Sequence, residues 1–382
     1  MRIVERDFTK DEFIAHLSDN FDEVFKEDVR KKWLKMYCVL VSDDDWQSRL
    51  FADDELQRHG EVLRFSPKIR TEPTADEEDR GALGQGDTEE LAQSEEPESK
   101  EPETYWVVPH CKGLVILYTT ASNEKYQSDL GKRIDKTCGA TRMWMRQDLY
   151  NIFWRGMMED TEGFVYYFKS TRRAYEETLC RLRPEYKRRL NYSGLDATQT
   201  LEEFRESYGV TPDVVYLETQ KGVKLHIRND GLFAVQEPSK EAMNLFYKYL
   251  DEIKPRILAM SDVSKALGYD IMRDSSDRSV VSIDAGVISL KDRKLDTTVL
   301  TSLKDNISNF SMIDEHLETG SLSYTATVVD AKKGSVFNIT ASESRIVIVP
   351  KFNFTFESFF SFYREIAESV DEHAEFSLLS NS

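Results

Sequence analysis

The stretch Phe-Tyr-Lys-Tyr-Leu-Asp-Glu-Ile at residues 246–253 recurs in altered form as Phe-Phe-Ser-Phe-Tyr-Arg-Glu-Ile at residues 359–366. The similarity extends backwards from both stretches, so that residues 214–253 align with residues 326–366 after a gap of one residue. Apolar side chains recur at matching positions, as in Leu225 with Phe337, Ile227 with Ile339 and Val235 with Ile348. In each stretch a two-residue alternation gives way to helical spacing, which predicts three strands and then a helix.

These patterns predict an α+β protein whose carboxyl half is a tandem β-β-β-α duplication, with a first repeat over residues 198–268 and a second over residues 269–382. Helices are expected over 198–208, before the first copy, and over 296–307, before the second. Chance similarity between two common β-β-β-α patterns would give the same matches. The duplication describes an architecture and does not by itself indicate an activity.

The composition is that of an ordinary globular protein, with 382 residues of which 40% are apolar. No apolar run approaches the roughly 20 residues that a membrane helix needs. The first residues lack the apolar core of a signal peptide, and the four cysteines are widely scattered. We therefore expect a cytoplasmic protein with free thiols and no membrane association.

Much of the net charge of −18 comes from one segment, residues 71–104, which has 13 acidic residues and only two basic ones, Arg80 and Lys100. This segment contains no aromatic residue and is predicted to be a disordered insertion. The strands expected on either side of it, at 61–65 and 105–108, look like partners. We expect a solvated loop within one domain, or alternatively an acidic arm that shields a basic groove or recruits a protein partner.

Strands alternating with helices predict a layered α/β-type domain over residues 1–170. Two helices are expected within residues 1–35, the second with an apolar stripe that ends at Trp33. The run Tyr-Cys-Val-Leu-Val at 37–41 is apolar enough to be a strand buried on both faces. A basic segment over residues 171–197 is expected to connect this domain to the first repeat.

The strongest functional signal is the stretch 169–189, which has eight basic and three acidic residues within an acidic protein. Basic side chains neutralise phosphates and aromatic rings stack on bases, so this mixture favours DNA or RNA binding. The residues expected to contact phosphates are Lys169, Arg172, Arg173, Arg181, Arg183, Lys187, Arg188 and Arg189, with Tyr175 and Tyr186 as candidate stacking residues. A solvated basic face that pairs with the acidic segment or with a partner protein is the alternative.

Alternation in the first repeat gives a second indication of a basic surface. It places Lys224, His226 and Arg228 on the face of their strand opposite to Leu225 and Ile227. At the corresponding positions of the second repeat the residues are uncharged.

Signals for catalysis are weak. Asp43, Asp44 and Asp45 follow a strand, where carboxylates can hold a metal ion, but three adjacent residues cannot all converge on one ion and a turn or helix cap explains them equally. His110 and Cys111 are neighbours on a predicted strand, which would turn their side chains to opposite faces. No nucleotide-binding or hydrolase motif occurs, and no cofactor or metal is predicted.

The sequence therefore favours a non-enzymatic, nucleic-acid-associated or regulatory protein. A metal-dependent nuclease or phosphotransferase that uses Asp43–Asp45 remains an alternative, as does a scaffold that recruits a partner through the acidic segment. Whether any catalysis occurs is left undecided at this stage.

Overall fold

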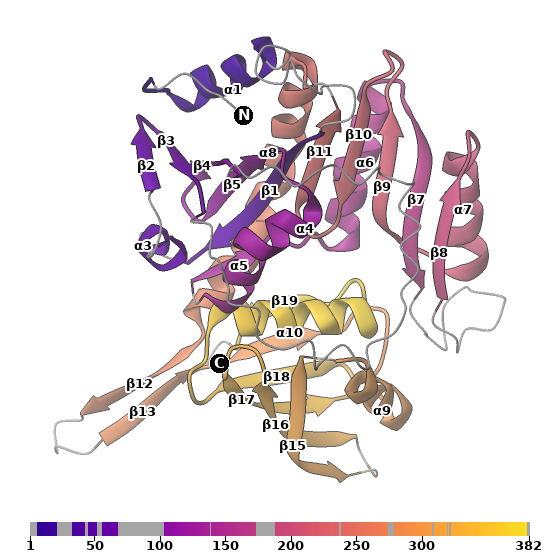
Figure 1. Ribbon diagram of the computed structural model, residues 1–382. Helices are drawn as coiled ribbons and strands as arrows, with labels where there is room; N and C mark the ends of the chain where they lie inside the picture. Colours follow the sequence, from indigo (N-terminus) through magenta and orange to yellow (C-terminus); the bar gives the residue numbers. More distant parts are fainter. Residues whose placement is uncertain are drawn as a thin grey trace, which may run out of the picture.

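The computed structural model describes residues 6–20, 33–42, 45–51, 56–67, 103–137, 139–172, 188–236, 238–273, 279–307, 309–318, 320 and 322–379. These residues form two antiparallel sheets, a two-stranded ribbon and the helices that pack on them (Figure 1), so the predicted α+β class is confirmed. None of the helices in these ranges is both long enough and apolar enough to cross a membrane.

The larger sheet has eleven strands within the described residues. In spatial order its path is β2 (Leu56–His59), β3 (Val62–Phe65), β4 (Tyr105–Cys111), β5 (Leu114–Thr119), β1 (Trp33–Val41), β11 (Leu232–Gln236), β10 (Lys224–Arg228), β9 (Pro212–Glu218), β7 (Phe164–Arg172) and β8 (Arg188–Ser193). The short strand β6 (Ala140–Arg142) lies off this path and pairs with the end of β1.

Strand β1 lies at the centre of this sheet, between β5 and β11. Because β11 belongs to the first predicted repeat, the sheet runs across the boundary that was predicted at residue 170. The predicted connecting segment 171–197 likewise contains β8 and the start of helix α7 (Ala197–Tyr208). Trp33 is the first residue of β1 and not the end of a helical stripe, so that part of the helix prediction is wrong.

Both faces of β1 are buried, as its apolar sequence predicted. Leu34, Met36 and Leu40 face one core, which also contains residues of the helices α1 (Lys10–Asp19), α6 (Gln147–Asp160), α7 and α8 (Lys240–Ala266). The alternating residues of β1 face a second core, which is covered by α3 (Trp46–Leu50), α4 (Asn123–Tyr126), the π-helical turn η3 (Gln127–Gly131) and α5 (Lys132–Lys136). In Figure 1 the helices α4 and α5 lie in front of β1.

The second core extends over only part of the larger sheet. Its strand members come from β1, β3, β4, β5 and β6, whereas from β11 only Leu232 belongs to it, and β7, β8, β9 and β10 contribute no member. This statement holds for the residues that the structure describes. The β10–β9–β7–β8 end of the sheet therefore contributes no residue to the second core.

The smaller sheet is built from residues 286–378. Its strands follow the order β15 (Phe310–Glu318), β16 (Ser323–Asp330), β17 (Val336–Ser342), β18 (Arg345–Pro350), β14 (Gly286–Ser289) and β19 (Glu375–Leu378). Helices α9 (Thr297–Asn306) and α10 (Phe356–Ser369) accompany it, and the ribbon of β12 (Gly268–Arg273) and β13 (Ser279–Asp284) projects away from the body in Figure 1.

Helix α8 joins the two sheets into one packed body. It begins at a cap in which the Ser239 hydroxyl accepts a hydrogen bond from the backbone N–H of Ala242, and it continues for 27 residues although Pro255 lies inside it. It contacts α1 and α6 beside the larger sheet, and α10 and β19 beside the smaller one. Buried residues of both sheets accordingly belong to one continuous core.

Each of the two predicted copies folds as three antiparallel strands followed by a helix, β9–β10–β11–α8 in one case and β16–β17–β18–α10 in the other. The matched residues Leu225, Ile227, Phe337 and Ile339 are all buried. The registers differ, however, because Leu225 pairs with Val235 whereas Phe337 pairs with Pro350. The common element order supports similar topologies, and descent from one duplicated unit stays a prediction.

Most of the predicted insertion at 71–104 lies outside the described residues. The strands on either side of it, β3 and β4, are hydrogen-bonded neighbours, with Leu63 opposite Val107. The prediction that the segment interrupts a single domain is consistent with this pairing.

Candidate nucleic-acid interface

The predicted basic stretch coincides with a hairpin at the edge of the larger sheet. Lys169 lies in β7 and Arg189 in the edge strand β8, and both are exposed. The backbones of Arg172 and Arg188 pair at the far end of the hairpin. The other predicted residues lie outside the described residues; they are Arg173, Tyr175, Arg181, Arg183, Tyr186 and Lys187.

The strand register places Lys169 and Arg189 on the same face of the hairpin. Lys169 is opposite Asn191, which is two residues from Arg189 in β8. Lys169 and Arg189 therefore share one face of the hairpin, and Phe168 and Ser170 lie on the other. Phe168 and Ser170 are fully buried on the face against which α7 packs. The two basic side chains are therefore on the opposite side of the sheet from α7.

Aromatic residues continue this face across three strands. Tyr167 of β7 is opposite Tyr216 of β9, and Tyr216 is opposite His226 of β10. The rings of Tyr167 and Tyr216 meet edge to face with centroids 5.2 Å apart, and the Tyr216 ring stacks on the His226 imidazole at 4.1 Å. A β-bulge between Val165 and Tyr167 brings Tyr166 to the same group, 5.9 Å from Tyr216.

Two further cations lie among these rings. The Lys224 ammonium is 5.6 Å from the centre of the Tyr166 ring. Arg228 is partly buried and pairs with Asp230 through two hydrogen bonds of 3.0 and 2.5 Å. We call the whole group the aromatic-basic face; it comprises Tyr166, Tyr167, Lys169, Arg189, Tyr216, Lys224, His226 and Arg228.

His226 is a neutral aromatic member of this face and not a cation, which corrects the predicted basic row Lys224–His226–Arg228. Only 9% of the side chain is exposed. Burial, together with the positive charges of Arg228 and Lys35, lowers the pKa of His226 to about 3. Its Nε2 atom is buried without a hydrogen-bond partner.

Neither Tyr167 nor Tyr216 was predicted from the sequence to be a stacking residue. Tyr216 could have been found from alternation, because it lies between Val215 and Leu217, which are fully buried. In β7 the bulge hides the pattern, since the buried residues Val165 and Phe168 are three positions apart.

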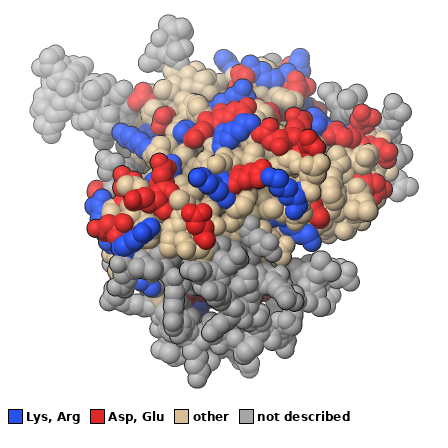
Figure 2. Space-filling view, turned by 90° about the horizontal axis from the view of Figure 1, so that it is seen from above, with Lys and Arg blue, Asp and Glu red and all other residues tan. Residues whose placement is uncertain are grey.

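Figure 2 shows the distribution of charge on one face of the molecule. On the face that Figure 2 shows, basic and acidic side chains are intermingled among the described residues and no large area of a single sign stands out. On the aromatic-basic face, Lys169, Arg189, Lys224 and Arg228 are accompanied by Glu218, which is opposite Lys224. This face therefore combines the positive charge and the rings that nucleic-acid binding requires.

Of the alternative catalytic residues Asp43, Asp44 and Asp45, only Asp45 lies among the described residues. It is the residue before α3, where its backbone carbonyl accepts hydrogen bonds from the α3 residues Ser48 and Arg49. Asp45 therefore lies at a helix terminus, although its side chain makes no capping hydrogen bond.

His110 is enclosed by charged groups on a bulged part of β4. Its Nδ1 atom is 2.8 Å from the Lys10 ammonium and its Nε2 atom is 2.8 Å from an Asp251 carboxylate oxygen. Burial and the nearby Lys10 lower the pKa of His110, and burial raises the pKa of the Cys111 thiol. With both ring nitrogens engaged and the thiol protonated, the pair has no arrangement for nucleophilic catalysis.

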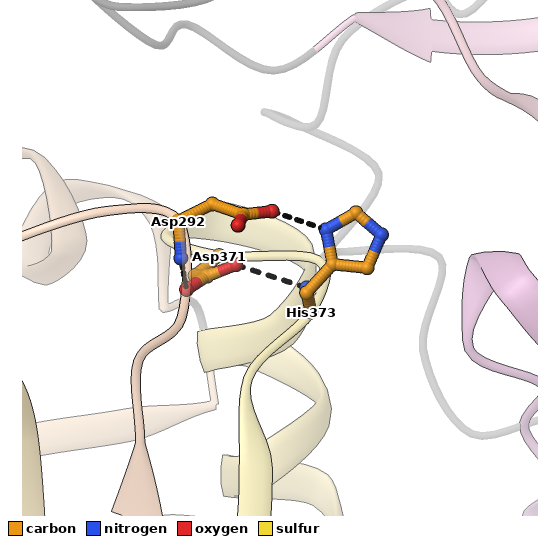
Figure 3. Close-up of side chains that lie close together, drawn as sticks. All are labelled: Asp292, Asp371 and His373. Atoms are coloured by element: carbon orange, nitrogen blue, oxygen red, sulfur yellow. Dashed lines mark hydrogen bonds and ion pairs between the residues drawn. The ribbon is translucent and has the colours of Figure 1, made fainter.

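A cluster of Asp292, Asp371 and His373 has donor atoms within 4.8 Å of one another, close enough to share a divalent cation. Figure 3 shows the hydrogen bonds that join the three residues. The buried Asp371 carboxylate accepts hydrogen bonds from the backbone N–H groups of Lys291 (2.6 Å), Asp292 (3.0 Å) and His373 (2.9 Å). His373 Nδ1 is 2.5 Å from an Asp292 carboxylate oxygen. Asp371 thus fastens the loop after β14 to the loop after α10, which is a structural role.

Comparison with known proteins adds one match. Residues 158–230 match the model of a protein family that is described as a family middle domain. No curated protein matches the chain. The matched part is about a fifth of the chain, yet it includes β7, β8, α7, β9, β10 and every residue of the aromatic-basic face.

Proposed function

We propose that this protein is a non-enzymatic, cytoplasmic nucleic-acid-binding protein, and that the aromatic-basic face is its binding surface. The observation that carries the proposal is the placement of two exposed cations, Lys169 and Arg189, on the same face of an edge hairpin as partly exposed tyrosines. Neutralising phosphates requires accessible cations, and these two are accessible.

The position of the face within the fold also supports this proposal. The edge strand β8 leaves one side of the hairpin without a neighbouring strand among the described residues. A ligand can approach there without displacing part of the sheet. Arg228 already has a carboxylate partner in Asp230, so we assign the main phosphate contacts to Lys169 and Arg189.

The experiment is fluorescence anisotropy of the full chain with labelled DNA and RNA over a range of salt concentrations. A Lys169→Ala/Arg189→Ala variant removes two cations. If both contact phosphates, the slope of log K against log salt should become shallower by about 1.4 for a single strand, at 0.7 per contact. A Lys112→Ala/Lys332→Ala variant is the matched control, because both lysines are exposed and lie outside the face.

An unchanged slope in the Lys169→Ala/Arg189→Ala variant would refute the assignment of these contacts. Absence of salt-dependent binding at low ionic strength would refute the function itself. Removal of residues 71–104 tests the alternative roles of the acidic segment. Tighter binding would indicate that the segment shields the basic surface in cis, whereas loss of a protein partner would indicate a scaffold.

A further inference from the structure

Resting on the proposed function, we infer that the aromatic-basic face selects single-stranded nucleic acid by stacking an unpaired base on Tyr167. The inference concerns the class of nucleic acid, which the charges alone do not set, since lysine and arginine attract any phosphate backbone. It depends on the rings and on the width of the face.

Tyr167 has a ring surface available for a base. The side chain is partly exposed, and it makes an edge-to-face contact with Tyr216 at an interplanar angle of 86°. A contact of this kind occupies at most one face of the Tyr167 ring. The exposed part of the ring can stack on a base, and such stacking tolerates any sequence because every base has a π-face.

Lys169 is well placed to accompany a base stacked on Tyr167. The two residues are two positions apart on β7 and point to the same side, which separates them by about 6.6 Å along the strand. Arg189 of the neighbouring strand β8 continues the same face one step further. A strand of nucleic acid that follows β7 would therefore meet a ring first and cations next.

The width of the face argues against an intact duplex. The strands β8, β7, β9 and β10 are consecutive neighbours, so at about 4.8 Å per step their backbones span about 14 Å. The major groove of unbent B-DNA is about 12 Å wide and admits a helix or a two-stranded ribbon. Bases in a duplex are also stacked on one another and cannot reach Tyr167, whereas unpaired bases can.

The test compares four labelled probes of equal length by anisotropy at one low salt concentration: oligo(dT), oligo(rU), an abasic deoxyribose-phosphate oligomer, and a DNA duplex. The abasic oligomer has the phosphates without the bases. We expect the full chain to bind oligo(dT) or oligo(rU) about 5- to 100-fold more tightly than the abasic oligomer, the range that stacking of one base provides.

The Tyr167→Ala variant should lose most of this ratio while its affinity for the abasic oligomer stays the same. Tyr167→Phe keeps the ring and should retain the ratio, which shows that the effect is stacking and not misfolding. Phe352→Ala is the matched control, because Phe352 is 63% exposed on the smaller sheet, away from the face.

Equal binding of the abasic oligomer and the base-bearing strands, or an equal loss by Tyr167→Ala on all probes, would overturn the inference. So would tighter binding of the duplex than of either single strand. In each of these cases salt-dependent binding that weakens in the Lys169→Ala/Arg189→Ala variant would leave the proposed function standing. Failure of all four probes to bind would remove both.

Discussion

Replacement of His226 by phenylalanine should flatten the dependence of stability on pH. In the folded protein the imidazole is buried, stacked on Tyr216 and held near two cations, and its pKa is lowered from an ordinary value of 6.5 to about 3. The folded state therefore favours the neutral ring, whereas the unfolded chain binds a proton near pH 6.5. The stability that this group contributes is present above pH 6.5 and is lost as the pH falls towards 3.

The size of the effect follows from the two pKa values. Each pH unit within this window costs about 1.4 kcal/mol of unfolding free energy, so lowering the pH from 7 to 5 should remove about 2 kcal/mol through His226 alone. His226→Phe keeps an aromatic ring against Tyr216 and removes the titrating group. Between pH 7 and pH 5 the variant should therefore gain about 2 kcal/mol of unfolding free energy relative to the parent protein.

Urea unfolding at a series of pH values, followed by tryptophan fluorescence, measures this difference. The other histidines are present in both proteins, so their contributions cancel. Leu195→Ala is the control, because Leu195 is 83% exposed and carries no titrating group. A difference between His226→Phe and parent that stays constant within about 0.5 kcal/mol from pH 7 to pH 5 would refute the reasoning.

Three further outcomes are expected. Asp371→Asn replaces a buried carboxylate that accepts three backbone hydrogen bonds. In urea denaturation it should lower the unfolding free energy by about 2–4 kcal/mol. A loss below about 0.5 kcal/mol would contradict the loop-fastening role. Gly231→Ala should destabilise by more than about 2 kcal/mol, because φ is +81° and the new Cβ would lie 2.7 Å from the Met143 carbonyl oxygen. At Gly222 φ is +80° and a new Cβ would have no atom within 4 Å, so Gly222→Ala should cost only about 1 kcal/mol. Equal losses for the two alanine variants would show that the close contact at Gly231 is unimportant.

Local features of the fold could be predicted from the sequence where a short pattern decides them. The apolar run at 37–41 is buried on both faces. Helix α7 ends at Gly209, which adopts the left-handed conformation with φ of +59°. The helix predicted to end at Trp33 lies largely outside the described residues, and Trp33 itself begins β1, in which Leu34 and Met36 alternate on one face.

The pairing of distant strands could not be predicted. Alternation in β11 shows that Phe233 and Val235 face a core, but it says nothing about which strand lies beside them. That neighbour is β1, about 200 residues earlier in the chain. Without this pairing the first predicted repeat looked like a separate unit.

The candidate site was predicted only in part. The charge excess identified Lys169 and Arg189, whereas the rings beside them come from β9 and from the bulged start of β7, where simple alternation fails. His226 was expected to be a surface cation, and its burial results from the aromatic neighbours Tyr216 and Trp33, which the sequence pattern does not locate.

The central place of β1 has a consequence for synthesis of the protein on the ribosome. One edge of β1 pairs with β5, while the other is divided between β11 along residues 33–37 and β6 along residues 39–41. Until β11 emerges, about 200 residues after Trp33, the first half of that edge lacks its final neighbour. At 5–20 residues per second the delay is roughly 10–40 s. Over this time an apolar strand edge is open to pairing with other chains, so the amino-terminal strands need protection from aggregation until β11 has been made.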